Sequence, residues 1–157
     1  HVSAEDTSAE SAVLSVEDLV LLPGQRYTAV AFDALEDIQA MALHDDYEEL
    51  ESGSFRVRAI HAATGVGEVD IWNITDMGSP ATLYEDVPFA AVGDYYDLGA
   101  GAYSVGFDVD DDASPDVSFD LPEIAADEVI NLFAVNDGAV KLLAQFEGST
   151  TAFITAK

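Results

Sequence analysis

The sequence contains no cysteine, and only five of its 157 residues are basic. Without cysteine neither a disulfide framework nor a thiolate metal site can form, so we expect stability to depend on packing and on salt. The scarcity of lysine and arginine excludes nucleic-acid binding, because phosphate contacts require many of them. No membrane span is expected either, because no run approaches the roughly 18 apolar residues that one requires.

Catalytic motifs are missing as well. No serine lies in a Gly-x-Ser-x-Gly elbow, and no glycine-rich phosphate loop occurs. His61 precedes Asp70 of the next predicted strand, and His44 is followed by Asp45 and Asp46, but neither group has the partners that fix a metal or acid–base site. We expect His61 to bond a loop carbonyl instead. The sequence therefore predicts a protein that is not an enzyme, with no catalytic and no cofactor-binding residues.

Acidic residues are abundant: 31 Asp and Glu give a formal net charge of -26. They are spread from Glu5 to Glu147 between hydrophobic stretches, and the 49% hydrophobic content is enough for a core, so we expect a folded protein. Repulsion among so many negative charges destabilises a compact chain in dilute solution. In 1 M salt the Debye length shortens to about 3 Å, which removes most of this repulsion. We interpret this balance as adaptation of a halophile to brine, with calcium binding as the alternative.

Alternating apolar and polar residues indicate β-strands along the whole chain, and no convincing helical period appears. Residues 103–109 give the clearest half-buried strand, and 27–32 is predicted to be buried on both sides. Short strands separated by turn residues are typical of β-sandwiches. The predicted strands are 13–22, 27–32, 38–43, 55–60, 69–74, 83–84, 89–92, 103–109, 117–121, 129–135 and 140–146.

The chain also repeats itself at an offset of 102 residues, without a gap. Tyr27 then falls on Val129, and further aligned pairs are Leu19 with Leu121, Leu22 with Ile124, Val30 with Leu132, Ile38 with Val140, Met41 with Leu143 and Ala42 with Ala144. A repeat this long is a whole domain, so the chain holds parts of two tandem modules, the first lacking about its first 47 residues. We predict an arm at 1–12, a partial module at 13–52, a complete module at 53–148 and a terminal strand at 149–157.

Three stretches carry a family resemblance: RVRAIHA (56–62), VDIW (69–72) and VPFAAVGDYYDLGAGAYSV (87–105). They resemble the repeating module of prokaryotic surface proteins called domain of unknown function 4397, with one full copy here preceded by the carboxyl-terminal half of another. The resemblance implies immunoglobulin-like antiparallel β-sandwich modules in tandem, of which the amino-terminal one is incomplete. At 63–66 the sequence reads Ala-Thr-Gly-Val where the family usually carries a Ser-Pro-Asp type of turn. The family implies no activity.

One cluster of carboxylates could hold a hard cation such as Ca²⁺, which binds several oxygens from one loop. Its candidate ligands are Asp108, Asp110, Asp112 and Asp116. The loop is not an EF-hand, because Ala113 replaces the required glycine and Phe119 replaces the bidentate glutamate. The alternative is a hairpin connection whose carboxylates are only solvated.

Three further features have a structural and a functional interpretation. Arg56 and Arg58 share a strand face, so we expect them to pair with carboxylates on a neighbouring strand or, alternatively, to contact another subunit. Asn73 begins a glycosylation sequon. The aromatic residues Trp72, Tyr84, Tyr95 and Tyr96 belong to the core or form a carbohydrate platform.

The sequence thus favours a non-enzymatic structural protein outside the cell of a halophile. A half-sandwich exposes apolar faces and strand edges, so we expect another copy to complete it by β-strand addition and to build a fibre or surface layer. The donor is the arm before Val13 or the terminal strand with Phe153 and Ile154, and the partners are other copies of the chain. The alternative is a carbohydrate- or calcium-binding adhesin module excised from a larger surface protein.

Overall fold

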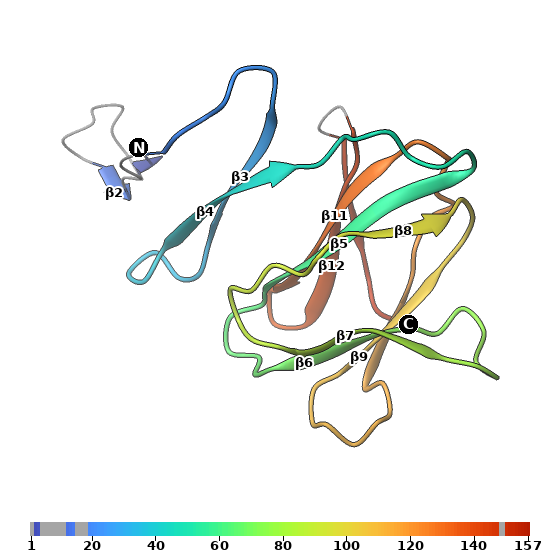
Figure 1. The fold of residues 1–157 in the computed structure, drawn as a ribbon. Helices are drawn as coiled ribbons and strands as arrows, with labels where there is room; N and C mark the ends of the chain where they lie inside the picture. Colours follow the sequence, from blue (N-terminus) through green and yellow to red (C-terminus); the bar gives the residue numbers. More distant parts are fainter. Residues whose placement is uncertain (1, 4–11, 15–18, 148–149) are drawn as a thin grey trace. The chain divides into compact units, whose positions relative to one another are not determined.

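The computed structural model describes residues 2–3, 12–14, 19–147 and 150–157, and it consists of strands without an α-helix in these ranges. The predicted all-β class is therefore confirmed. The chain divides into two units, His1–Glu48 and Glu49–Lys157 (Figure 1). In the ranges given above, no helix is long and apolar enough to cross a membrane.

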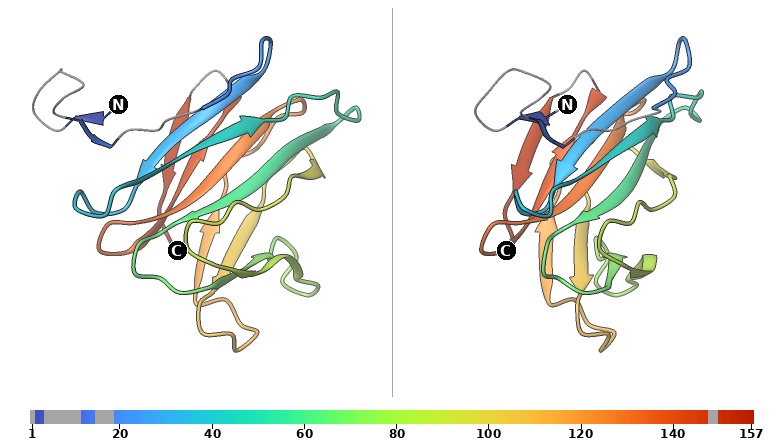
Figure 2. Two further views of the ribbon diagram at one scale, coloured as in Figure 1. Left: turned by 60° about the vertical axis from the view of Figure 1, so that its left-hand side comes forward. Right: turned by 90° about the vertical axis from the view of Figure 1, so that its left-hand side faces the viewer.

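The second unit contains two sheets, which Figure 2 shows from two further sides. The four-stranded sheet has the order β10–β9–β6–β7, and its strands are β6 Val69–Asn73, β7 Ala81–Val87, β9 Ser104–Asp108 and β10 Val117–Asp120. The five-stranded sheet has the order β13–β12–β11–β5–β8, and its strands are β5 Ser54–Ala62, β8 Tyr96–Gly99, β11 Val129–Asn136, β12 Val140–Gln145 and β13 Thr151–Ile154. All pairs are antiparallel except β5 with β11, which run parallel. Two sheets around one core are compatible with the immunoglobulin-like sandwich.

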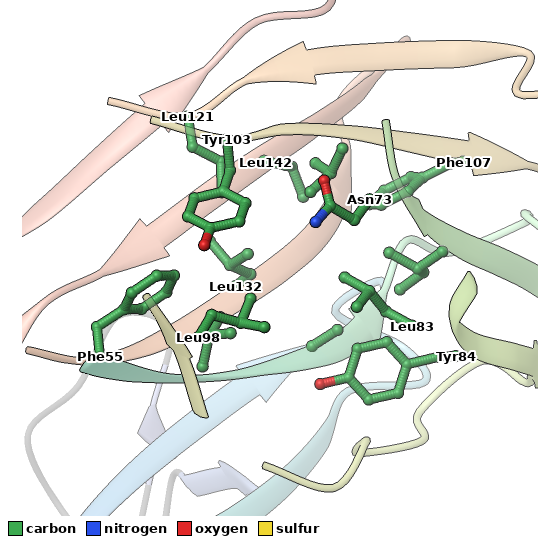
Figure 3. A pocket seen from close by; sticks show the side chains of 14 residues that line it. Phe55, Asn73, Leu83, Tyr84, Leu98, Tyr103, Phe107, Leu121, Leu132 and Leu142 are labelled. Carbon is green, nitrogen blue, oxygen red and sulfur yellow. The ribbon is translucent and has the colours of Figure 1, made fainter. Parts of the chain in front are cut away.

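The core of this unit is built from alternate residues of both sheets, as the period of two requires. From β5 it takes Phe55 and Val57, whose neighbours in sequence face the other way. The remaining large members are Val69, Ile71, Val87, Val105, Phe107, Phe119, Leu121, Ile124, Ile130, Leu132 and Leu142. A cavity of about 30 Å³ remains between the sheets, lined almost entirely by apolar side chains (Figure 3). This shared core holds the two sheets together.

The first unit is much smaller. Its main element is a hairpin of β3 (Arg26–Phe32) and β4 (Gln39–Asp45), and a short pair is formed by β1 (Val2–Ser3) and β2 (Ala12–Leu14). Within the described residues neither β3 nor β4 pairs with a third strand. Most of the arm predicted at 1–12 lies outside the described residues.

Two strand predictions in this unit need correction. The run 13–22 contributes a strand only at Ala12–Leu14 among its described residues, and 19–22 is an irregular segment with exposed aliphatic side chains. Strand β3 is not buried on both sides, because Ala29 and Ala31 are exposed on the face opposite Val30. The apolar sequence YTAVAF has small side chains on one face, and a continuous apolar run cannot show which faces are covered.

Strand pairing also corrects the internal repeat. Val30 lies opposite Met41 in the first hairpin, whereas the aligned Leu132 lies opposite Ala144 in the hairpin β11–β12. The second strand of each hairpin is therefore aligned at an offset of 103 rather than 102. The ungapped alignment is wrong after the turn, because a shift of one residue would exchange the two faces of the strand.

Candidate functional site

The loop between β9 and β10 holds the predicted cation ligands. Asp108, at the end of β9, is 1% exposed, and its carboxylate accepts three backbone hydrogen bonds. Its Oδ1 accepts from the amides of Asp110 (3.3 Å) and Asp111 (2.9 Å), and its Oδ2 accepts from that of Ser114 (3.2 Å). Asp108 thus organises the loop through its own backbone contacts.

Three of the four predicted ligands come together. Carboxylate oxygens of Asp108, Asp110 and Asp116 lie within 4.8 Å of one another, whereas Asp112 is not part of this group. The neighbouring carboxylates, first Asp112 and then Asp116, raise the pKa of Asp110 above its usual value. Such a group of oxygens has the chemistry that a hard cation binds, and a cation would relieve the repulsion among them.

The backbone of this loop is strained. Asp111 and Ala113 have φ angles of 58° and 63°, in the left-handed region that costs an ordinary residue about 1–2 kcal/mol. Ala113 is the residue that replaces the glycine of an EF-hand, so the chain adopts the turn in spite of its side chain. The hydrogen bonds accepted by Asp108 offset this cost.

Arg56 and Arg58 are engaged inside the second unit. Arg56 forms a bidentate pair with Asp97, its partner on β8, with Nε–Oδ1 and Nη2–Oδ2 distances of 2.7 and 2.8 Å. The guanidinium holds the pKa of Asp97 below its usual value. Arg58 is buried, donates to Oδ1 of Asn131 at 2.7 Å and lies 4.5 Å from the ring centre of Tyr95. The carboxylate pairing expected from the sequence is present at Arg56.

His61 is buried on β5 and bonds a loop carbonyl, as expected. Its Nε2 lies 2.8 Å from the carbonyl oxygen of Gly67, and its Nδ1 accepts from the amide of Ala63 at 3.3 Å. These contacts require the neutral tautomer with the proton on Nε2. Among the residues that the structure describes, no metal-ligand group includes a histidine.

Asn73, the predicted glycosylation site, lies at the end of β6. Its side chain lines the interior cavity beside Phe107 (Figure 3), and its Oδ1 accepts from the amide of Thr75 at 3.0 Å. Asn73 is half-buried at the strand end, so glycosylation of its amide stays a prediction.

The terminal strand with Phe153 and Ile154 forms the edge of the five-stranded sheet as β13. Ile154 packs against the core, whereas Phe153 is 69% exposed. Beyond β13 the chain crosses to the other sheet, where the amide of Lys157 donates to Ser118 O at 3.0 Å and its Nζ lies 2.5 Å from Asp120 Oδ1. Nothing in the sequence pattern indicated these contacts of Lys157 with β10, because they join residues that are far apart in the chain.

Comparison with known proteins gives one positive result. None of the curated proteins compared with the chain matches it. The family model of the domain of unknown function DUF4397 matches residues 1–72, a range that contains RVRAIHA and VDIW and crosses from the first unit into the second. The match confirms, over residues 1–72, the resemblance seen in the sequence.

Proposed function

We propose that the protein is a non-enzymatic structural protein of the cell exterior of a halophile, and that it assembles when one copy supplies strands to the incomplete first unit of the next. The observation that carries the proposal is the state of the β3–β4 hairpin. Its aligned counterpart, β11–β12, lies in the middle of a five-stranded sheet, between β5 and β13. The hairpin β3–β4 is a two-stranded sheet.

The hairpin has the features of an acceptor. An isolated two-stranded sheet is marginally stable in water, and its open edges are templates for further pairing. One face of the hairpin carries the larger apolar residues, of which Phe32 and Leu43 are already buried and Val30 and Met41 are partly buried. The preceding segment exposes Leu19, Val20, Leu21 and Leu22, and burying these four side chains would add to the hydrogen bonds gained at the strand edges.

The donor that we favour is β13. Its inner edge pairs with β12 in regular register, and it is the terminal strand of its sheet, so its outer edge can pair without leaving the unit. Its sequence, Thr-Ala-Phe-Ile, has no charge and no proline, the usual means by which edge strands avoid association. Phe153 already projects from this edge into solvent. Pairing of β13 with the hairpin of another copy would extend the sheet head to tail and produce a fibre.

Substitution at either side tests this contact. Phe153→Lys places a charge on the donor edge, and Met41→Lys places one on the apolar face of the hairpin, so each variant should abolish fibres seen by electron microscopy in molar salt. Met77→Lys is the matched control, because Met77 is 74% exposed in the turn between β6 and β7 and belongs to neither β13 nor the hairpin. A wild-type chain that elutes as a monomer in molar salt would contradict the proposal.

Adaptation to brine rests on the charge and has its own test. The melting temperature should rise between dilute buffer and molar salt as repulsion among the 31 acidic residues is screened. A melting temperature indifferent to salt would remove this part of the proposal. Antibody labelling of the producing cells would test the exterior location.

Calcium binding is a second candidate function, supported by the convergence of Asp108, Asp110 and Asp116. Against it, Asp108 already accepts three backbone hydrogen bonds, and Asp116 Oδ2 accepts a further one from the amide of Val109 at 2.8 Å. Calorimetric titration with Ca²⁺ in molar salt decides between the two interpretations. Binding heat and a raised melting temperature, both lost in Asp116→Asn, would support the site, and their absence would leave the loop a structural connection.

A further inference from the structure

A groove in the second unit is lined by residues of strand β7 and of the segment that leads into β8. Both strands are labelled in Figure 1. The volume of the groove is about 510 Å³. Its aliphatic lining residues include Val87, Pro88, Ala91 and Val92. The aromatic and acidic lining residues are Tyr84, Glu85, Asp86, Asp94 and Tyr96. The groove therefore combines aromatic rings with hydrogen-bond acceptors.

The two tyrosines meet edge to face, with ring centres 5.2 Å apart and an interplanar angle of 83°. The side chain of Tyr84 is held at both ends. Its hydroxyl donates to the carbonyl oxygen of Asp94 at 2.8 Å, and its ring also lines the interior cavity (Figure 3). Burial raises the pKa of Tyr84, so the hydroxyl remains protonated as a donor. Tyr96 is 40% exposed and presents aromatic surface to solvent.

Gly93 fixes this arrangement. A Cβ atom at Gly93 would lie 2.3 Å from Cε1 of Tyr84, so only glycine lets the backbone approach the ring so closely. The ring and the segment leading to β8 therefore hold each other in place. The groove is preformed rather than built by a mobile loop, which lowers the entropic cost of binding.

Charge and geometry exclude several ligand classes. The lining has three carboxylates and no lysine, arginine or histidine, so phosphates and acidic sugars would be repelled. The carboxylates of Glu85, Asp86 and Asp94 do not converge on one point, since the described part of the chain has a single metal-ligand group, in the β9–β10 loop. A cation is therefore a poor fit.

A peptide strand is a poor fit as well. Strand β7 pairs with β6 through two register irregularities, and Asp86 within β7 has a φ of 49°. Irregularities of this kind twist an edge away from straight pairing. What remains is a small neutral molecule with an apolar face and several hydroxyl groups.

We propose that this groove binds a neutral carbohydrate, with the apolar face of a sugar ring against Tyr96 and its hydroxyls donating to the carboxylates of Glu85 and Asp94. Aromatic rings supply contact area at little entropic cost, and carboxylates are strong acceptors for hydroxyl groups. The four aromatics suggested from the sequence do not form one platform, because Trp72 and Tyr95 do not line the groove. The site does not depend on assembly, since all its residues lie in one unit.

Titration of the full chain in molar salt with neutral gluco-, galacto- and mannobiose, followed by NMR, tests the site. We expect saturable shifts of the Tyr96 and Val92 resonances with at least one disaccharide, and at least tenfold weaker binding by Tyr96→Ala. Tyr96→Phe should retain most of the affinity, because the ring face is preserved, and Asp94→Asn should bind several-fold more weakly.

Three results would overturn the proposal: no saturable shift with any of the disaccharides, equal binding of glucuronate, or binding that survives Tyr96→Ala. Phe153→Ala is the matched control, because it removes an exposed ring outside the groove and should leave the affinity unchanged. The NMR spectrum of Tyr96→Ala without sugar should keep the dispersed signals of a folded chain, although its melting temperature should fall slightly because the lost ring packs on Tyr84. The dispersed spectrum separates lost binding from lost folding. Because Phe153 belongs to the proposed donor edge, failure of assembly and failure of sugar binding are distinguishable.

Discussion

The hairpins β3–β4 and β11–β12 have aligned sequences and different surroundings. In β11 the first six residues are all buried, whereas in β3 only Phe32 is buried and three residues are exposed. The difference follows from the neighbours, because β5 and β13 flank β11–β12 and the opposite sheet covers its inner face. A strand sequence thus specifies a strand, while the rest of the sheet decides how much that strand contributes to stability.

The largest expected difference is in amide hydrogen exchange. Amides of β11 and β12 should exchange only by global unfolding, which for a domain of this kind costs about 5 kcal/mol or more. Amides of β3 and β4 in the single copy should exchange much faster, because a two-stranded sheet opens at little cost. Exchange measured by mass spectrometry in molar salt checks this, and protection of β3 that appears only in assembled material would tie the hairpin to a partner copy. Equal protection of both hairpins in the monomer would refute the comparison.

The second expected effect concerns two aligned aliphatic residues. Leu132→Ala, in the core of the second unit, should lower the free energy of unfolding by about 2–5 kcal/mol. Val30→Ala, in the hairpin, should cost less than about 1 kcal/mol, because its side chain is only partly covered. Urea denaturation in molar salt measures both. A loss at Val30 as large as that at Leu132 would mean that the first unit has a core of its own.

The terminal strand gives a smaller effect. Ile154→Ala should cost about 1–2 kcal/mol, because Ile154 is partly buried against the core and helps β13 to cover the edge of β12. Phe153→Ala, at the adjacent exposed position, should change stability by less than about 0.5 kcal/mol in the monomer. Thermal unfolding of both variants measures these costs. Ile154→Ala would weaken the cover of the β12 edge, so that β12 resembles the uncovered β4, whereas Phe153→Ala would not. A larger cost for Phe153→Ala than for Ile154→Ala would show that Phe153, and not Ile154, faces the core.

Acid should loosen the second unit through two carboxylates. The pKa of Asp97 is lowered by Arg56, and that of Asp120 by the hydrogen bonds and charge of Lys157 and by Ser104. A lowered pKa gives stability that is present above the unfolded value, about 3.9, and is lost as the pH falls through the folded value. Asp97→Asn should cost no more than about 1 kcal/mol at neutral pH, since the pair is partly exposed, and should flatten the fall in stability below pH ~4. An unchanged acid profile would refute the assignment.

The smallest effect is expected at Asp110, in the β9–β10 loop. Its pKa is raised by like charges, so its contribution is favourable at low pH and is lost as the pH rises through the raised value. Asp110→Asn should therefore raise the melting temperature slightly in dilute buffer at neutral pH and leave it unchanged in molar salt. Asp112→Asn should act in the same direction, because the carboxylate of Asp112 is the largest cause of the raised pKa of Asp110. A calcium-dependent stabilisation lost only in Asp110→Asn would identify a cation site.

Much of the second unit could be predicted from its sequence because strand periodicity is local. The alternation at 103–109 marks β9, and the runs at 129–135 and 140–146 mark β11 and β12 to within a residue or two at each end. Pairing of Arg56 with a carboxylate was predictable because few cations compete in so acidic a chain. The hydrogen-bonded role of Asp108 was not, because it depends on how the backbone of its loop turns.

Sequence alone determined that this protein is made of strands and that it carries a formal net charge of -26, because strand periodicity is a property of neighbouring residues and charge follows from composition. Only the tertiary structure decided which of the two similar hairpins belongs to the core. It also decided that Lys157 bonds to the four-stranded sheet and that Tyr84 and Tyr96 line the same groove. Each of these depends on pairing between residues far apart in the chain. Such pairing is selected by the packing of the whole sheet, and no local pattern encodes it.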